Sequence, residues 1–179
     1  MIYFKKANVT HIDTIFQWLA EPHMMEFWDN TPQHKEDILN FIHGKKQHYF
    51  EKTTCYWVGF IQESPSCFIL SDVIRKDQML PELHHQYLSQ TGTTITLDFG
   101  IGNPHYLNQG LSAPSIQAFI DFYRREVDTS ADTFFIDPDQ HHQKAQHVYA
   151  KAGFKKVGEF NVTAGAFVGH IIYLMVRKL

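Results

Sequence analysis

The chain has only two cysteines among its 179 residues, Cys55 and Cys67. Two thiols cannot form a disulfide framework or a thiolate metal site, so both are expected to be reduced and buried. The twelve histidines are scattered along the chain. They form no helical pair four residues apart with a carboxylate nearby, so no metal site is expected.

The sequence also lacks an excess of positive charge and any long apolar run. Its net charge is -3, which gives no basic surface for nucleic acid and suits a small cationic partner better. No stretch is long enough to span a bilayer, and no secretory pattern opens the chain. Because repeats, low-complexity segments and linkers are absent, residues 1–179 are expected to form one domain. We expect that domain to be cytoplasmic and either monomeric or homodimeric.

Alternating strand-like and helix-like segments predict an α/β fold, a mixed sheet with helices on both faces. Apolar spacing predicts helices at 10–20, 33–43, after Ser112 and at 140–152. β-Branched and aromatic segments predict strands at 2–6, 54–61, 67–74, 93–101, 133–136, 154–162 and 167–176. The polar segment 75–92 is the least regular, and we interpret it as a surface insertion that forms a flap over a binding site.

A strand, a tight turn and a helix start are predicted over residues 98–113. Free backbone N–H groups at a helix start attract phosphate oxygens, and small residues let the backbone approach closely. This segment therefore predicts a phosphate-binding site, although an ordinary strand-to-helix loop would look similar. The residues predicted to contact a phosphate-bearing cofactor are Phe99, Gly100 and Ile101 of the strand and Leu107, Asn108, Gln109, Gly110, Leu111, Ser112 and Ala113 of the turn and helix start.

A second segment predicts a helix with Tyr149 four residues before Gly153-Phe154. Together the two segments resemble the cofactor-binding half of the GNAT superfamily of N-acetyltransferases. The resemblance implies the GNAT fold with a mostly antiparallel sheet, acetyl-CoA as donor and an amine as acceptor. Compared with the loop pattern of the superfamily, Gly110 matches the glycine position, Ser112 is small enough for its position, and Leu107 departs from the residue types usual at its position. His142 stands where an Asn usually contacts the cofactor.

Two side chains carry the predicted chemistry. A phenol at Tyr149 can share its proton with a leaving thiolate, although a lone helical Tyr often only packs. A carboxylate at Asp98 can attract an ammonium ion and accept its proton, or it can simply be a solvated strand residue. Because no Cys lies near these motifs, direct attack by the amine in a ternary complex is expected.

Within the superfamily, the chain resembles the aminoglycoside 6'-N-acetyltransferases in particular. Three stretches carry this resemblance: 18–28, 97–104 and 135–138. This likeness implies that Asp98 is the catalytic carboxylate and that Asp137 contacts the substrate. It also implies that Glu26 and Trp28 line the acceptor cleft. A polyamine sugar needs several carboxylates and an aromatic wall, and Asp139 adds a further carboxylate.

Two alternatives remain open on the sequence. Asp137-Pro138-Asp139 also resembles acyltransferases that modify hydroxylated lysine or ornithine in siderophore biosynthesis. Those enzymes typically carry His where this chain has Asp98. A non-catalytic CoA-binding sensor module is the other alternative, because Leu107, Asn108 and His142 depart from the superfamily pattern.

Overall fold

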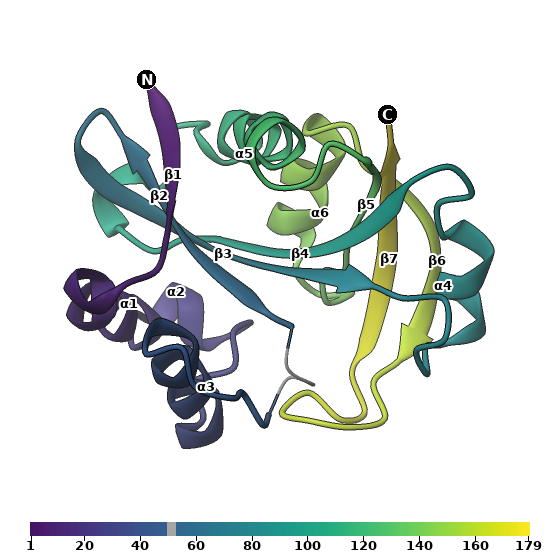
Figure 1. The fold of residues 1–179 in the computed structure, drawn as a ribbon, viewed down its shortest axis with the longest axis horizontal. Coiled ribbons are helices and arrows are strands. Elements are labelled where there is room, and N and C mark those ends of the chain that lie inside the picture. Colours follow the sequence, from purple (N-terminus) through teal and green to yellow (C-terminus); the bar gives the residue numbers. More distant parts are fainter. Residues whose placement is uncertain (50–52) are drawn as a thin grey trace.

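The computed structural model describes residues 1–49 and 53–179. Its described residues build a seven-stranded sheet in the order β1-β2-β3-β4-β5-β7-β6 (Figure 1). The strands are β1 (Ile2–Lys6), β2 (Cys55–Ile61), β3 (Ser64–Ile74), β4 (Thr93–Ile101), β5 (Ala131–Ile136), β6 (Lys155–Asn161) and β7 (Ile171–Lys178). The helices are α1 (Ile12–Leu19), α2 (Pro22–Met25), α3 (Pro32–Ile42), α4 (Glu82–Tyr87), α5 (Ser112–Glu126) and α6 (Gln143–Lys151), with 3-10 turns at Val9–His11 and Pro104–Tyr106.

The sheet is antiparallel except between β4 and β5, which confirms the mixed, mostly antiparallel arrangement. The parallel pairing of β4 with β5 ends at Leu97 opposite Ile136. On its other side, β4 stays paired with β3 as far as Ile101. The β5 side of residues 98–101 is therefore left without a neighbouring strand, and we call this gap the β4–β5 opening.

Helices cover both faces of the sheet, as predicted (Figure 1). On one face, α5 and α6 pack on a core that includes Ile95, Phe119 and Tyr149. On the other face, α1, α2 and α3 pack on a second core around Ile15, Tyr56 and other apolar side chains. These two cores fix the helices that flank the β4–β5 opening.

The flap predicted for segment 75–92 is wrong. Leu83 and Tyr87 of α4 pack against a small core made by Phe135, Leu174 and neighbouring apolar residues of β5, β6 and β7. Apolar side chains spaced along α4 bury against the sheet rather than covering a cavity. The α4 part of this segment thus packs on the sheet, while most of residues 75–82 are exposed.

Several element ends differ from the predictions because local polar contacts set them. Asn8, not Thr10, caps the first turn, since its side-chain oxygen accepts the Thr10 N–H. The helix predicted from residue 140 begins at Gln143, because Asp139 accepts hydrogen bonds from His141 and His142 in a preceding turn. The last strand begins at Ile171, so residues 162–170 form a loop. The positive φ of Gly153 ends α6 as expected.

Gly102, directly after β4, has no side chain and so leaves room for the indole ring of Trp18. A Cβ atom at this position would overlap the indole ring of Trp18, which is almost fully buried. We expect Gly102→Ala to destabilise the fold by about 1–3 kcal/mol, since overpacking a dense core forces its neighbours to move. Thermal unfolding measures this loss. In a Trp18→Leu background the same substitution should cost clearly less, and an equal cost in both backgrounds would contradict the clash.

Candidate active site

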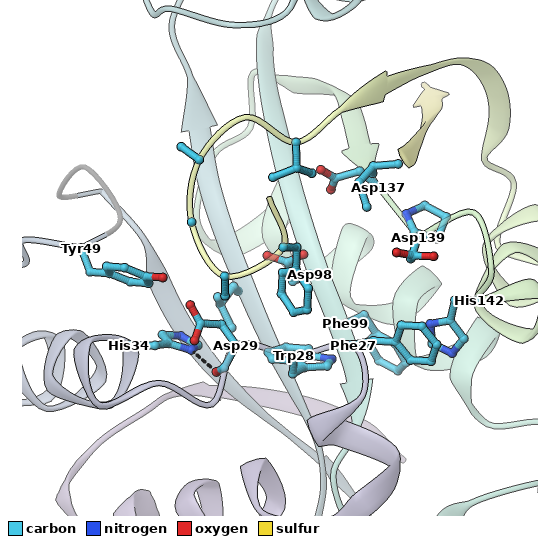
Figure 2. A pocket seen from close by; sticks show the side chains of 18 of the residues that line it. Phe27, Trp28, Asp29, His34, Tyr49, Asp98, Phe99, Asp137, Asp139 and His142 are labelled. Atoms are coloured by element: carbon cyan, nitrogen blue, oxygen red, sulfur yellow. Dashed lines mark hydrogen bonds between the residues drawn. The ribbon is translucent and has the colours of Figure 1, made fainter. Parts of the chain in front are cut away.

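A cavity of about 470 Å³ lies where the β4–β5 opening meets the helices of the second core. Its walls come from segments far apart in the sequence (Figure 2). The α2–α3 connection supplies Phe27, Trp28 and Asp29, and β4 supplies Asp98 and Phe99. The remaining walls are residues 137–139, His142 and Tyr149 of the α6 region, His34, Tyr49, Leu70, Ile172, and residues 162 and 164–167 of the β6–β7 loop.

Asp98 points into this cavity from the face of the sheet opposite α5 (Figure 2). Its side chain is exposed to the cavity, and desolvation by the surrounding walls raises the pKa of Asp98 to about 8. The negative charges of Asp137 and then Asp72 add to the effect. Desolvation likewise raises the pKa of Asp137. A carboxyl group tuned toward neutral pH is a better proton acceptor for an amine than an ordinary aspartate.

Tyr149 fills the β4–β5 opening. Its ring is buried against the first core, and its hydroxyl donates a long hydrogen bond of 3.4 Å to the carbonyl oxygen of Phe99. Burial, followed by the negative charges of Asp98 and Asp137, raises the pKa of Tyr149 above its ordinary value. The phenol therefore stays protonated and remains a donor in the cavity wall.

The backbone of Phe99 points toward the same opening. Since the N–H and C=O groups of one strand residue project to the same side, the Phe99 N–H lies on the side of its carbonyl, toward Tyr149. Among the strands that the structure describes, none pairs with β4 there. A backbone donor in this position is suited to polarise an acyl carbonyl.

The predicted phosphate site is a turn that leads into α5. Asn108 and Gly110 have φ values of 62° and 71°, which curl the backbone tightly ahead of the helix. The first α5 hydrogen bond runs from the Ser115 N–H to the Leu111 oxygen, so the N–H groups of Ser112 and Ala113 lie ahead of it. A side chain at Gly110 would project into open space, so a ligand can reach this backbone.

The charge at this turn also favours an anion. Lys144 at the start of α6 donates to the Asn108 side chain at 2.6 Å, which places a cation beside the start of α5. The dipole of this 15-residue helix adds positive potential at the same end. Leu107 contributes no polar side chain and packs against the first core, as expected from its departure from the pattern. These features suit an anionic ligand, and binding of a coenzyme A diphosphate at this turn stays a prediction.

His142 occupies the residue before α6 and lines the cavity. Its ring stacks on Phe27 at 3.6 Å between ring centroids, a contact that joins the α2–α3 connection to α6. Burial lowers the pKa of His142. The structure therefore places His142 in the wall beside Phe27, and its contact with the cofactor remains a prediction.

The predicted acceptor residues divide into three groups. Trp28, Asp98 and Asp137 come together around the cavity. Asp139 also lines it, but its carboxylate is engaged by His170 Nδ1 at 2.6 Å and by the His141 N–H. Glu26 is exposed and does not line the cavity, although its charge acts on His142 in the cavity wall, whereas Asp29 does line it.

Sequence reasoning missed Asp29, Tyr49 and the loop 162–167 as wall residues. Asp29 follows Trp28 directly and precedes Thr31, a helix cap, which was a usable signal for a carboxylate beside the aromatic wall. Tyr49 and the loop carry no motif. Only the folded chain brings them to the cavity.

Other kinds of site find no support in the described residues. Across residues 1–49 and 53–179, no three His, Cys, Asp or Glu side chains gather in a way that would hold a metal ion. Among the helices of this same part of the chain, none has the length and apolar content needed to cross a membrane.

Residues 8–162 match the family model described as an acetyltransferase (GNAT) domain, and the chain belongs to this family. Acetyl-CoA is its acetyl donor. None of the curated protein sequences compared with the chain matches it.

Solved structures share the fold at low sequence identity. The aminoglycoside N(6')acetyltransferase from Legionella pneumophila superposes with a TM-score of 0.76 at 22% identity, covering 98% of this chain and 90% of its own. The aminoglycoside acetyltransferase AAC(6')-Ib, solved with coenzyme A and kanamycin, gives 0.76 at 15% identity, with coverages of 99% and 95%. Spermidine N-acetyltransferase from Vibrio cholerae, solved with CoA and spermine, gives 0.70 at 12% identity, with coverages of 99% and 95%.

Proposed function

We propose that this enzyme acetylates a primary amine of a polycationic small molecule, the 6'-amine of an aminoglycoside. One observation carries the proposal. Asp98, Asp137 and Asp29 face a single cavity that is also walled by Trp28 and Tyr49. Carboxylates bind ammonium groups, and aromatic faces suit both cations and the apolar faces of sugar rings. The resemblance of 97–104 to aminoglycoside 6'-N-acetyltransferases supports the finer assignment.

Each of these residues has a separate role in the direct transfer of the acetyl group. Bound acetyl-CoA supplies a thioester whose carbonyl is open to attack and whose thiol can leave. Asp98 attracts the ammonium group of the acceptor and takes its proton, so that a neutral amine faces the opening. The Phe99 N–H would donate to the acyl oxygen. The Tyr149 hydroxyl would protonate the departing sulfur, and the second proton that the nitrogen loses as the amide forms would restore the phenol.

The raised pKa of Asp98 predicts a pH profile. Because only the ionised carboxylate accepts a proton, kcat/KM should rise with pH through the range near 8. Asp137→Asn removes the charge that helps to raise the pKa of Asp98, so the rising limb should move to lower pH. Initial rates measured across pH with a saturating donor test this shift. An unmoved limb in Asp137→Asn would mean that the carboxyl pair does not control the profile.

Thiol release from acetyl-CoA with a panel of amines tests the proposed acceptor. The panel contains kanamycin-type aminoglycosides with and without a free 6'-amine, spermidine, and N-hydroxylysine. Turnover only with the free 6'-amine supports the proposal. Turnover only with spermidine or only with N-hydroxylysine assigns a polyamine or a siderophore precursor instead. Binding of acetyl-CoA without turnover of any amine favours a sensor module.

A further inference from the structure

The open edge of β4 carries two carbonyl groups that face the β4–β5 opening. The Gly102 N–H donates to the Ser66 oxygen of β3 at 3.0 Å, so Gly102 directs its N–H toward β3. Because successive residues of a strand direct their peptide groups to alternate sides, Phe99 and Ile101 direct theirs into the opening. Among the described strands, none pairs with β4 at these two residues on that side. Both carbonyl groups therefore need hydrogen-bond partners from elsewhere.

Two side chains hold these carbonyl groups, one from each face of the sheet. Tyr149, from the side of α5 and α6, donates to the Phe99 oxygen. His23 belongs to α2, which lies with α1 and α3 on the other face (Figure 1). Its Nε2 lies 2.8 Å from the Ile101 oxygen. Because a carbonyl oxygen only accepts, the proton in this contact is on His23 Nε2. The two side chains thus supply hydrogen bonds that a neighbouring strand would otherwise give.

The packing of α2 against β4 holds His23 in place before any ligand arrives. α2 lies this close because Gly100 has no side chain: a Cβ atom there would stand 2.8 Å from Met24 Sδ and 3.0 Å from Trp28 Nε1. Met24 follows His23 directly and is itself 1% exposed in the second core. A side chain locked by such packing fixes the group that it binds with little further loss of entropy.

The geometry points to His23 as a positioning residue that keeps the Phe99 N–H directed at the acyl oxygen of bound acetyl-CoA. The inference rests on the proposed use of this N–H and gives a role to a residue that does not line the cavity. His23 holds the Ile101 carbonyl, two residues beyond Phe99 on the same edge. Without this contact the end of β4 would be held by β3 and by Tyr149 alone. A donor that polarises a carbonyl is effective only when its direction is fixed in advance.

The infrared carbonyl stretch of bound acetyl-CoA, isotope-labelled at the acyl carbon, tests this role without any acceptor. In the wild-type protein the Phe99 N–H should lower this stretch relative to free acetyl-CoA. His23→Leu removes the N–H donor and keeps an apolar side chain, so the stretch should return toward the free value. His23→Gln places an amide N–H at similar reach and should keep the wild-type value. Equal stretches in wild type and His23→Leu overturn the proposal, as does a His23→Gln protein that behaves like His23→Leu.

Steady-state kinetics with an amine that is turned over give the second readout. His23→Leu should lower kcat about three- to tenfold, the effect of one hydrogen bond, with the KM for acetyl-CoA within about twofold of wild type. His23→Gln should restore kcat, and a raised KM for acetyl-CoA with unchanged kcat would overturn the positioning role. If no amine is turned over, the proposed function fails, whereas the infrared comparison still decides the role of His23. His43→Leu, at the exposed end of α3, is the matched control and should behave as wild type in both assays.

Discussion

Asp98→Asn is expected to lower kcat/KM for the amine acceptor by about 10² to 10⁴, the usual range for losing a general base. The amide keeps the shape of the side chain and still faces the cavity, but it cannot take a proton or attract a cation. Both kcat and the KM for the acceptor should therefore deteriorate, while the KM for acetyl-CoA stays near wild type. Steady-state kinetics at about pH 8 measure these effects. Wild-type kinetics in this variant would remove Asp98 from the mechanism.

The same variant should be folded, and its stability gives an internal control. Because the folded state raises the pKa of Asp98, its ionised form costs stability. The cost is absent below the ordinary aspartate pKa, grows as pH rises from that value to the folded pKa of about 8, and is constant above it. The melting temperature of Asp98→Asn should thus equal that of wild type at about pH 4 and exceed it at about pH 9. A variant that melts lower at every pH would have lost activity through damage to the fold.

Tyr149→Phe is expected to lower kcat about 100-fold, since it removes the proton donor for the departing sulfur. The ring remains in the β4–β5 opening and keeps its packing against the first core, so the KM for acetyl-CoA should change little. Single-turnover rates measure the effect on the chemical step. A raised KM with unchanged kcat would instead mean that Tyr149 only packs.

Tyr123→Phe is a matched control for this loss. Tyr123 is as buried as Tyr149 and belongs to the same core, but it lies away from the cavity lining. Removing its hydroxyl should leave kcat unchanged. A loss of kcat in both tyrosine variants would indicate a general response of this core to lost hydroxyl groups.

Sequence patterns predicted the fold well where local chemistry sets the structure. The β-branched run of β4 and the apolar face of α5 appear where expected. Sequence patterns predicted the structure less well where tertiary packing determines it. Segment 75–92 is mostly polar, and its pattern gives no sign that Leu83 and Tyr87 pack against strands that lie much later in the sequence. The first residues predicted for α6 form a turn with Asp139 instead. This turn depends on hydrogen bonds that hydrophobic periodicity does not indicate.

The candidate site shows the same division. Asp98 and Tyr149 stand in motifs that reflect the chemistry of acyl transfer, and both lie at the β4–β5 opening. Glu26 was chosen by likeness alone, and a turn of the backbone exposes it while bringing Asp29 inward. Tyr49 reaches the cavity because the buried Asp37 binds its backbone. A single sequence contains no local signal for such a contact.

The two cores of the domain keep donor chemistry apart from acceptor choice. Phe99 and Tyr149 are supported by the core under α5 and α6, whereas Trp28 packs on the core under α1, α2 and α3. Under the proposed roles, a substitution in the second core would change the wall that Trp28 forms, while Phe99 and Tyr149 keep their support from the first core.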